Sequence, residues 1–162
     1  MLRHILACTV VFATALSARA APVVQFGPDE PDLQMKVQEA LILAEPGTVF
    51  EFAPGAYEFT MQLSLDVDDV TIRGAGMYET VWSFENQDMG SEGLYVTSNN
   101  VVIQDLGIED AKGNCFKSNG ANNLTLLRVR TEWTTGPSPD NGAYGLYPVS
   151  SENVLIAGCV AP

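Results

Sequence analysis

The chain has 162 residues, of which 20 are acidic and 8 are basic, so its formal net charge at pH 7 is −12. This charge excludes a general affinity for nucleic acid or for anionic membrane surfaces, both of which attract basic proteins. A chain of this length is expected to form one folded domain.

The first 20 residues have the pattern of a secretory signal peptide. Arg3 and His4 form a short basic start, residues 5–16 are an apolar run, and Ala18 and Ala20 form an A-x-A cleavage site. The run is shorter than the roughly 20 apolar residues that a membrane-spanning helix needs, so we expect no membrane insertion. The sequence therefore predicts a periplasmic or secreted protein that is cleaved after Ala20.

The predicted mature chain contains no histidine, because His4 is the only one and it leaves with the signal peptide. Such a chain has no Ser-His or Cys-His catalytic pair and no imidazole ligand for zinc. The remaining cysteines, Cys115 and Cys159, have no metal-ligand spacing. Because they fall in different strands a full repeat apart, we expect both to stay free.

Residues 21–47 are expected to form an N-terminal segment with one amphipathic helix. Apolar residues recur at positions i, i+4 and i+8, namely Leu33, Val37 and Leu41. Asp29 or Asp32 is suited to the helix start, and Pro46-Gly47 to its end. We expect this helix to lie across the first coil of strands and to close that end. Residues 48–59 then read as a strand, a Pro-Gly turn and a second strand.

Four similar segments recur after this point. "DDVTIRG", "NNVVIQD", "NNLTLLR" and "ENVLIAG" begin at Asp68, Asn99, Asn122 and Glu152. Their alignment puts four residues in one column, namely Asp69, Asn100, Asn123 and Asn153. An apolar pair two residues apart follows each of them, which indicates a strand with one buried face. Asparagine tolerates the left-handed backbone of a corner, and stacked amides can bond along a ladder.

A short strand precedes each of the later repeats. "GLYV", "CFKS" and "GLYP" begin at Gly93, Cys115 and Gly145. Three short strands in each repeat fit a solenoid whose coils pair in parallel, about 4.8 Å apart. The sequence therefore predicts an all-β parallel β-helix of about four coils over residues 48–162. One buried stack is expected to contain Val70, Val101, Leu124 and Val154.

The helix followed by "AEPGTVFEFAPGAYEF", then "VTIRGAG" and "GAYGLYPV" with "NVLI", resembles proteins of the pectate-lyase-like superfamily. The similarity is greatest to exported parallel β-helix repeat proteins related to alginate epimerases and to periplasmic NosD-type solenoids. The resemblance implies a single-stranded, right-handed parallel β-helix with an N-terminal capping helix. It also implies an acidic polysaccharide as substrate. Family members usually continue for more coils, so we expect a truncated chain that self-associates through an open C-terminal coil.

Two insertions at the same junction, residues 85–92 and 134–144, mark a candidate binding face. Tyr95, Lys117 and Tyr147 are expected to point outward in a column roughly 10 Å long. The candidate substrate-binding residues are Glu92, Tyr95, Asn114, Lys117, Trp133, Tyr144 and Tyr147. Their aromatic rings are suited to stacking on sugars, and Lys117 to an acid group. The alternative is that the outward tyrosines reflect only the preference of tyrosine for strands.

A second group of charged residues lies between positions 105 and 132. Asp105 and Arg128 occupy equivalent positions in successive repeats, so we expect them to be neighbours. A uronate lyase or epimerase needs a cation beside the substrate carboxylate and a base that removes the adjacent proton. The candidates for catalysis are Asp105, Asp110, Lys117, Arg128 and Arg130. Those for calcium, the one candidate cofactor, are Asp105, Glu109 and Asp110. Surface ion pairing is the simpler interpretation of this group.

Two functions stay open at this stage. The first is a lyase or epimerase that acts on an acidic glycan. The second is a non-catalytic solenoid that binds glycan or protein. In enzymes that the chain resembles, catalytic carboxylates come just before the strand of the outward column. Glu92, Asn114 and Tyr144 stand there in this chain, without a pair of acids.

Overall fold

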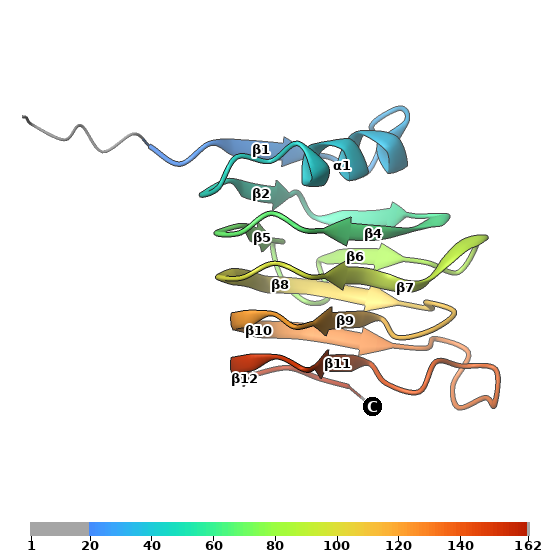
Figure 1. The fold of residues 1–162 in the computed structure, drawn as a ribbon. Coiled ribbons are helices and arrows are strands. Elements are labelled where there is room, and N and C mark those ends of the chain that lie inside the picture. Colours follow the sequence, from blue (N-terminus) through green and yellow to red (C-terminus); the bar gives the residue numbers. More distant parts are fainter. Residues whose placement is uncertain (1–19, 162) are drawn as a thin grey trace, which may run out of the picture.

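The computed structural model describes residues 20–161, so the predicted signal peptide, apart from Ala20, lies outside the described residues. The strands wind into a parallel β-solenoid of about five turns, stacked from α1 and β1 at one end to β11 and β12 at the other (Figure 1). The expectation of a parallel β-helix is therefore confirmed, with about one turn more than predicted. No helix in the described part is both long and apolar enough to span a membrane.

The larger sheet, here sheet A, follows the order β1-β2-β5-β8-β10-β12, with β3 and β6 beside this path. Its strands are β1 (Val23–Phe26), β2 (Val49–Phe52), β3 (Gly55–Glu58), β5 (Thr71–Arg73), β6 (Thr80–Ser83), β8 (Val101–Glu109), β10 (Asn122–Glu132) and β12 (Glu152–Ala157). Strand β1 was not expected, because four residues ahead of the helix give too short a pattern to recognise. It pairs in parallel with β2 and so adds a row to the sheet.

The smaller sheet, sheet B, has the order β4-β7-β9-β11. Its strands are β4 (Met61–Leu65), β7 (Met89–Val96), β9 (Phe116–Asn119) and β11 (Leu146–Val149). Every pairing in both sheets is parallel, as stacked turns of one coil require.

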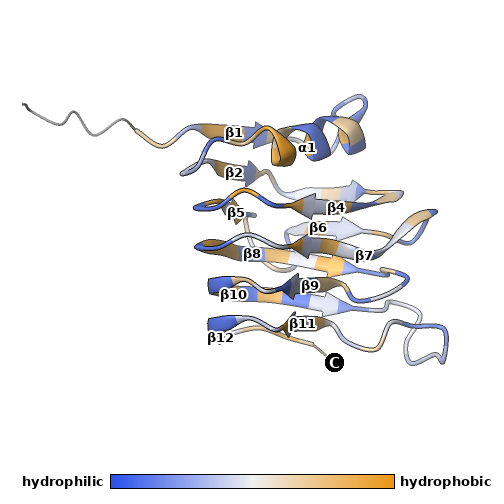
Figure 2. Ribbon diagram, in the orientation of Figure 1, coloured by the Kyte–Doolittle hydropathy of each residue, from blue (hydrophilic) through white to orange (hydrophobic). Residues whose placement is uncertain are grey.

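The predicted asparagine corner is present. Asp69, Asn100, Asn123 and Asn153 have φ angles of 62°, 56°, 59° and 52°, all in the left-handed region. Asn100 donates from Nδ2 to Asp69 at 2.8 Å, and Asn123 donates to Asn100 at 2.9 Å. The last step differs, because Asn153 donates to Asn122 instead. The corners ahead of β10 and β12 accordingly appear blue, the hydrophilic end of the scale, along one side of the solenoid in Figure 2.

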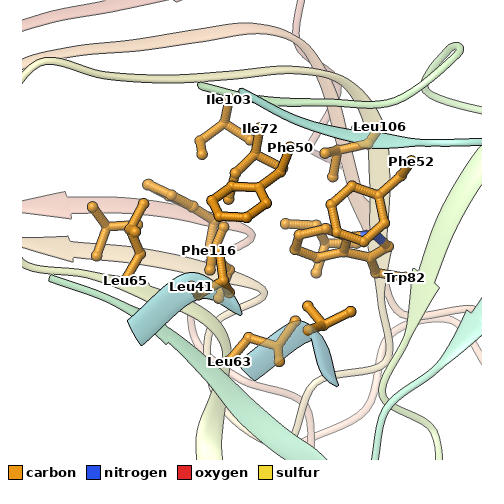
Figure 3. Packing of buried hydrophobic residues seen from close by; sticks show 14 of the residues in the cluster. Leu41, Phe50, Phe52, Leu63, Leu65, Ile72, Trp82, Ile103, Leu106 and Phe116 are labelled. Carbon is orange, nitrogen blue, oxygen red and sulfur yellow. The ribbon is translucent and has the colours of Figure 1, made fainter. Parts of the chain in front are cut away.

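The core fills the space between the two sheets. Leu124 pairs with Val101 on one side and Val154 on the other, and the first two are buried, as is Val70. Val154 is partly buried and packs against the same cluster. The predicted stack is therefore confirmed. Figure 3 shows other buried residues of the core, among them Phe52 and Trp82, whose ring centroids lie 4.8 Å apart.

Helix α1 (Leu33–Ile42) buries the face that the sequence predicts, formed by Leu33, Val37 and Leu41. Asp32 occupies the N-cap position, but its side chain makes no capping hydrogen bond. The helix ends four residues ahead of Pro46. A residue before proline avoids the helical conformation, so the helix has to stop before Glu45.

Two glutamines of α1 cover the outer edge of β4. Gln38 exchanges two hydrogen bonds with the backbone of Ser64, at 2.8 and 3.1 Å. The Oε1 atom of Gln34 accepts from the backbone amides of Thr60 and Met61, both at 3.0 Å. These side-chain amides satisfy backbone groups that a neighbouring strand would otherwise bind.

Candidate functional site

The outward residues of sheet B form the predicted column. Tyr95 pairs with Lys117, and Lys117 pairs with Tyr147, across β7, β9 and β11. Strand alternation directs them outward because their neighbours Leu94 and Phe116 are buried in the core. The Nζ atom of Lys117 lies 5.7 Å from the ring centroid of Tyr95 and 5.9 Å from that of Tyr147. These are cation–π distances.

Tyr144, which precedes β11 in the same turn as Tyr147, contacts this column. Its ring stacks on that of Tyr147, with centroids 4.5 Å apart and planes inclined by 20°. The side chain of Tyr144 is 52% exposed. We call Tyr95, Lys117, Tyr147 and Tyr144 the sheet-B ladder.

A buried carboxylate lies beside the ladder. Glu92 accepts a hydrogen bond from Lys117 Nζ at 3.0 Å, and its other oxygen accepts from the backbone and side-chain amides of Asn114 at 2.8 and 2.9 Å. Burial raises the pKa of Glu92, but the bonds from Lys117 and Asn114 outweigh burial and hold the pKa below its ordinary value. The hydrogen bond to Glu92 in turn raises the pKa of Lys117. The two groups therefore form an ionised pair with no net charge.

This pairing bears on the chemistry of the ladder. A general acid or base is most efficient when its pKa lies near the operating pH. Lys117 stays protonated because Glu92 raises its pKa, and Glu92 stays ionised because its own pKa is lowered. The ladder therefore presents aromatic surface, hydroxyl groups and an ammonium group whose charge is balanced by Glu92.

Asp105 and Arg128 are neighbours, as predicted from their equivalent repeat positions. Arg128 donates from Nε and Nη2 to the two carboxylate oxygens of Asp105, at 2.5 and 2.8 Å. Both residues have left-handed backbones, with φ of 58° and 51°, and bend β8 and β10 at the same level. The hydrogen bond to Asp105 raises the pKa of Arg128. This pair lies in sheet A and is not part of the sheet-B ladder.

Arg130 is the centre of a second ion-pair cluster in sheet A. Its guanidinium group is buried, pairs with Glu109 and Glu132, and donates to the backbone oxygen of Met77 at 3.2 Å. The ring of Tyr78 lies 4.9 Å from it. Burial lowers the pKa of Arg130, but the two carboxylates outweigh burial and raise it. The contact with Glu109 joins β10 to β8 in the preceding turn, and those with Met77 and Tyr78 reach the turn before it, whereas Glu132 lies in β10 itself. The cluster therefore links three turns of the stack.

The three candidate calcium ligands bind different partners. Asp105 is engaged by Arg128 and Glu109 by Arg130. Asp110 accepts bonds from the amide and hydroxyl of Thr134, at 2.7 and 2.8 Å. Within residues 20–161, no three His, Cys, Asp or Glu side chains are grouped so as to hold a metal ion. The calcium site stays a prediction to which this arrangement adds no support.

Trp133 is the member of the predicted binding set that lies apart from the others. Its indole nitrogen donates to the backbone oxygen of Ala111 at 2.8 Å, and the ring lines two shallow hollows beside Asn141. In the described part of the chain, no hydrogen bond or ring contact joins Trp133 to the ladder. Glu92, Asn114 and the ladder are together, as expected.

The sequence did not reveal how the ladder continues into β4. Ser64 pairs with Tyr95 and so occupies the same outward column. Gln62 donates to the Ser64 hydroxyl at 3.2 Å and accepts from the backbone amide of Glu92 at 3.2 Å. The alternation of "MQLSL", in which Leu63 and Leu65 are buried, is the signal that could have placed these residues.

Both cysteines in the described part are free, which confirms that expectation. Cys115 is buried, and burial raises the pKa of its thiol to about 12. A thiol in this state is a poor nucleophile, because the thiolate is the reactive form.

Comparison with known proteins gave no relative: no family model, no curated protein and no solved structure matches this chain. The resemblance to the pectate-lyase-like superfamily therefore stays a prediction from the sequence motifs, to which these comparisons add no support.

Proposed function

We propose that this protein binds carbohydrate through the sheet-B ladder and does not catalyse a reaction there. The observation that carries the proposal is the alignment of Tyr95, Lys117 and Tyr147 on one outward column, with the exposed ring of Tyr144 stacked on that of Tyr147. Tyrosine presents an apolar ring and a hydroxyl group, which suits the mixed apolar and hydroxyl surface of a sugar.

Binding is better supported than the alternative of a uronate lyase or epimerase. That chemistry needs a base whose pKa lies near the operating pH. Of the catalytic candidates, Lys117 and Arg128 both have raised pKa values because each donates to a carboxylate. Asp105 and Asp110 are engaged by Arg128 and Thr134. The candidates are also divided between the two sheets.

The proposal includes three features of the exported β-helix proteins that the chain resembles. The first is right-handed winding, which nearly all parallel crossover connections have. The second is a capping role for α1, supported by the bonds of Gln34 and Gln38 to the edge of β4. The third is export with cleavage after Ala20.

The proposal can be tested by affinity gel electrophoresis in gels that contain a panel of neutral and acidic polysaccharides. We expect retardation by at least one polymer, and weaker retardation of Tyr144→Ala. Loss of one ring contact of about 1 kcal/mol corresponds to roughly fivefold in Kd. Tyr78→Ala is the matched control, since Tyr78 is also exposed but lies over Arg130 on the other sheet.

Two results would refute the proposal. One is the absence of retardation by every polymer. The other is equal weakening in the Tyr144 and Tyr78 variants. The proposal that the protein does not catalyse a reaction is tested separately. The absorbance of unsaturated uronate is followed with alginate and pectate as substrates, with and without calcium, and we expect it not to increase.

A further inference from the structure

We infer that the ligand of the sheet-B ladder is an uncharged linear polysaccharide that lies along the solenoid axis. This inference rests on the proposed function and specifies the ligand class. It differs from the acidic glycan that the sequence resemblance implies. Two independent observations carry it: the charge state of the ladder, and the spacing of its members.

The ladder has no free positive charge. Its one cation, Lys117, is 3.0 Å from the buried carboxylate of Glu92, and the pair is neutral. The other outward residues of β9 and β11 are Asn119, Tyr147 and Val149, which are uncharged. Such a surface can donate hydrogen bonds to sugar hydroxyls, but it does not offset the charge of a uronate.

The rest of the chain repels anions. Residues 20–161 contain six basic and 20 acidic residues, a net charge of −14. Five of these six basic residues are already in ion pairs, namely Lys36, Arg73, Lys117, Arg128 and Arg130. A polymer with one negative charge in each sugar would therefore approach a surface of like charge.

The direction of the ligand follows from the position of the ladder in the stack. Tyr95, Lys117 and Tyr147 belong to successive turns, which are separated by about 4.8 Å. This step is close to the length that one sugar ring adds to a linear chain. A polymer along the axis therefore meets one ladder side chain for each sugar, whereas a polymer along a strand meets a single one.

The test compares polymers that share a backbone and differ in charge. Polygalacturonate and its fully methyl-esterified form are suitable probes, alongside uncharged glucans, xylans and mannans, with affinity measured by calorimetry at low and high salt. We expect binding to uncharged polymers that is insensitive to salt, at least tenfold tighter than binding to polygalacturonate. Among oligosaccharides of the bound polymer, we expect affinity to rise until about three sugars are present.

A charge variant sharpens this comparison. Glu92→Gln removes the partner of Lys117, and we expect it to increase affinity for polygalacturonate at least threefold at low salt, with the gain lost at high salt. Glu85→Gln, an exposed acidic residue outside the ladder, is the matched control and is expected to show no such gain. Circular dichroism establishes that both variants are folded.

The outcomes separate this inference from the proposed function. Tighter, salt-dependent binding of polygalacturonate by the unmodified protein would overturn the inference and leave carbohydrate binding intact. Affinity that is already maximal for a single sugar would overturn the axial direction. Binding to no polymer would refute both, because the inference depends on the proposed function.

Discussion

Substitutions of Glu92 and Lys117 test most directly whether these two residues form a stabilising ion pair. Glu92 accepts three hydrogen bonds from charged or amide donors, and its side chain is only 10% exposed. Glu92→Gln keeps one acceptor oxygen for Asn114 but turns an NH2 group toward the ammonium of Lys117. A hydrogen bond to a charged group contributes about 1.5–3 kcal/mol. The side chain of Lys117 is 27% exposed and can turn to water. We therefore expect Glu92→Gln to lower the free energy of unfolding by an amount near the lower end of this range, about 2 kcal/mol.

Removing the other partner of the pair should lower the free energy of unfolding by more. Lys117→Met leaves the carboxylate of Glu92 buried without its cation and removes the contact with both tyrosine rings. We expect a loss of about 2–3 kcal/mol. The double variant has neither charge, so its loss should be smaller than the sum of the two. We expect a coupling energy of about 1–2 kcal/mol.

The effect of pH has a definite sign. The pKa of Glu92 is lowered by folding, so its contribution is fully present above the ordinary value of 4.5 and is lost as pH falls through the lowered pKa. The pKa of Lys117 is raised, so its contribution is present below 10.5 and is lost as pH rises through the raised pKa. The difference between the unmodified protein and Glu92→Gln should therefore shrink in strong acid.

Urea unfolding followed by tryptophan fluorescence measures these quantities. Trp82 is buried in the core and reports on the loss of packing. The control Glu85→Gln should change the free energy of unfolding by no more than about 0.5 kcal/mol. A coupling energy near zero at pH 7 would refute the ion pair, as would a Glu92→Gln difference that persists unchanged into strong acid.

Three further predictions concern the stack and its end. Gly107→Ala should destabilise the protein by about 1–3 kcal/mol in the same unfolding assay, because a Cβ atom there would lie 2.8 Å from the backbone oxygen of Met77 and 2.9 Å from Arg130; an unchanged midpoint would contradict this close packing. The 162-residue polypeptide should self-associate through β12, because Ile156 is 46% exposed although it is in register with the buried Leu126. Ile156→Lys should therefore shift sedimentation toward the monomer. Sedimentation that does not depend on concentration would argue against this edge. Alkylation of the folded protein, mapped by mass spectrometry, should label Cys159 before Cys115, whose thiol is buried and has a pKa of about 12; the opposite order would contradict that burial.

The repeat architecture could be predicted because its signals are local. Strand alternation puts Val101 and Leu124 on the buried face whatever lies further along the chain. The left-handed corners at Asn100 and Asn123 reflect a preference of single residues. The spacing of equivalent residues then determined which side chains stack, including Asp105 on Arg128. Both the alternation within a strand and the interval between repeats can be read from the order of residue types in the chain.

The states of the candidate residues depended on contacts that periodicity does not contain. Lys117 was expected to meet an acidic sugar, whereas the fold gives it Glu92, 25 residues earlier, as a partner. Arg130 is held by the backbone of Met77, 53 residues away. Trp133 turns to the backbone of Ala111 and away from the ladder.

The sequence by itself therefore determined the solenoid, its buried column, its corners and the outward ladder, because each follows from residue preferences repeated at regular intervals. Only the tertiary structure decided which charges are free and which are neutralised. That depends on how the side chains of adjacent turns meet at distances near 3 Å, as for Lys117 and Glu92. It also depends on how Gln34 and Gln38 of a non-repeating helix satisfy the edge of a strand. A pattern of residue types does not contain these distances, because each arises from a single pair of side chains.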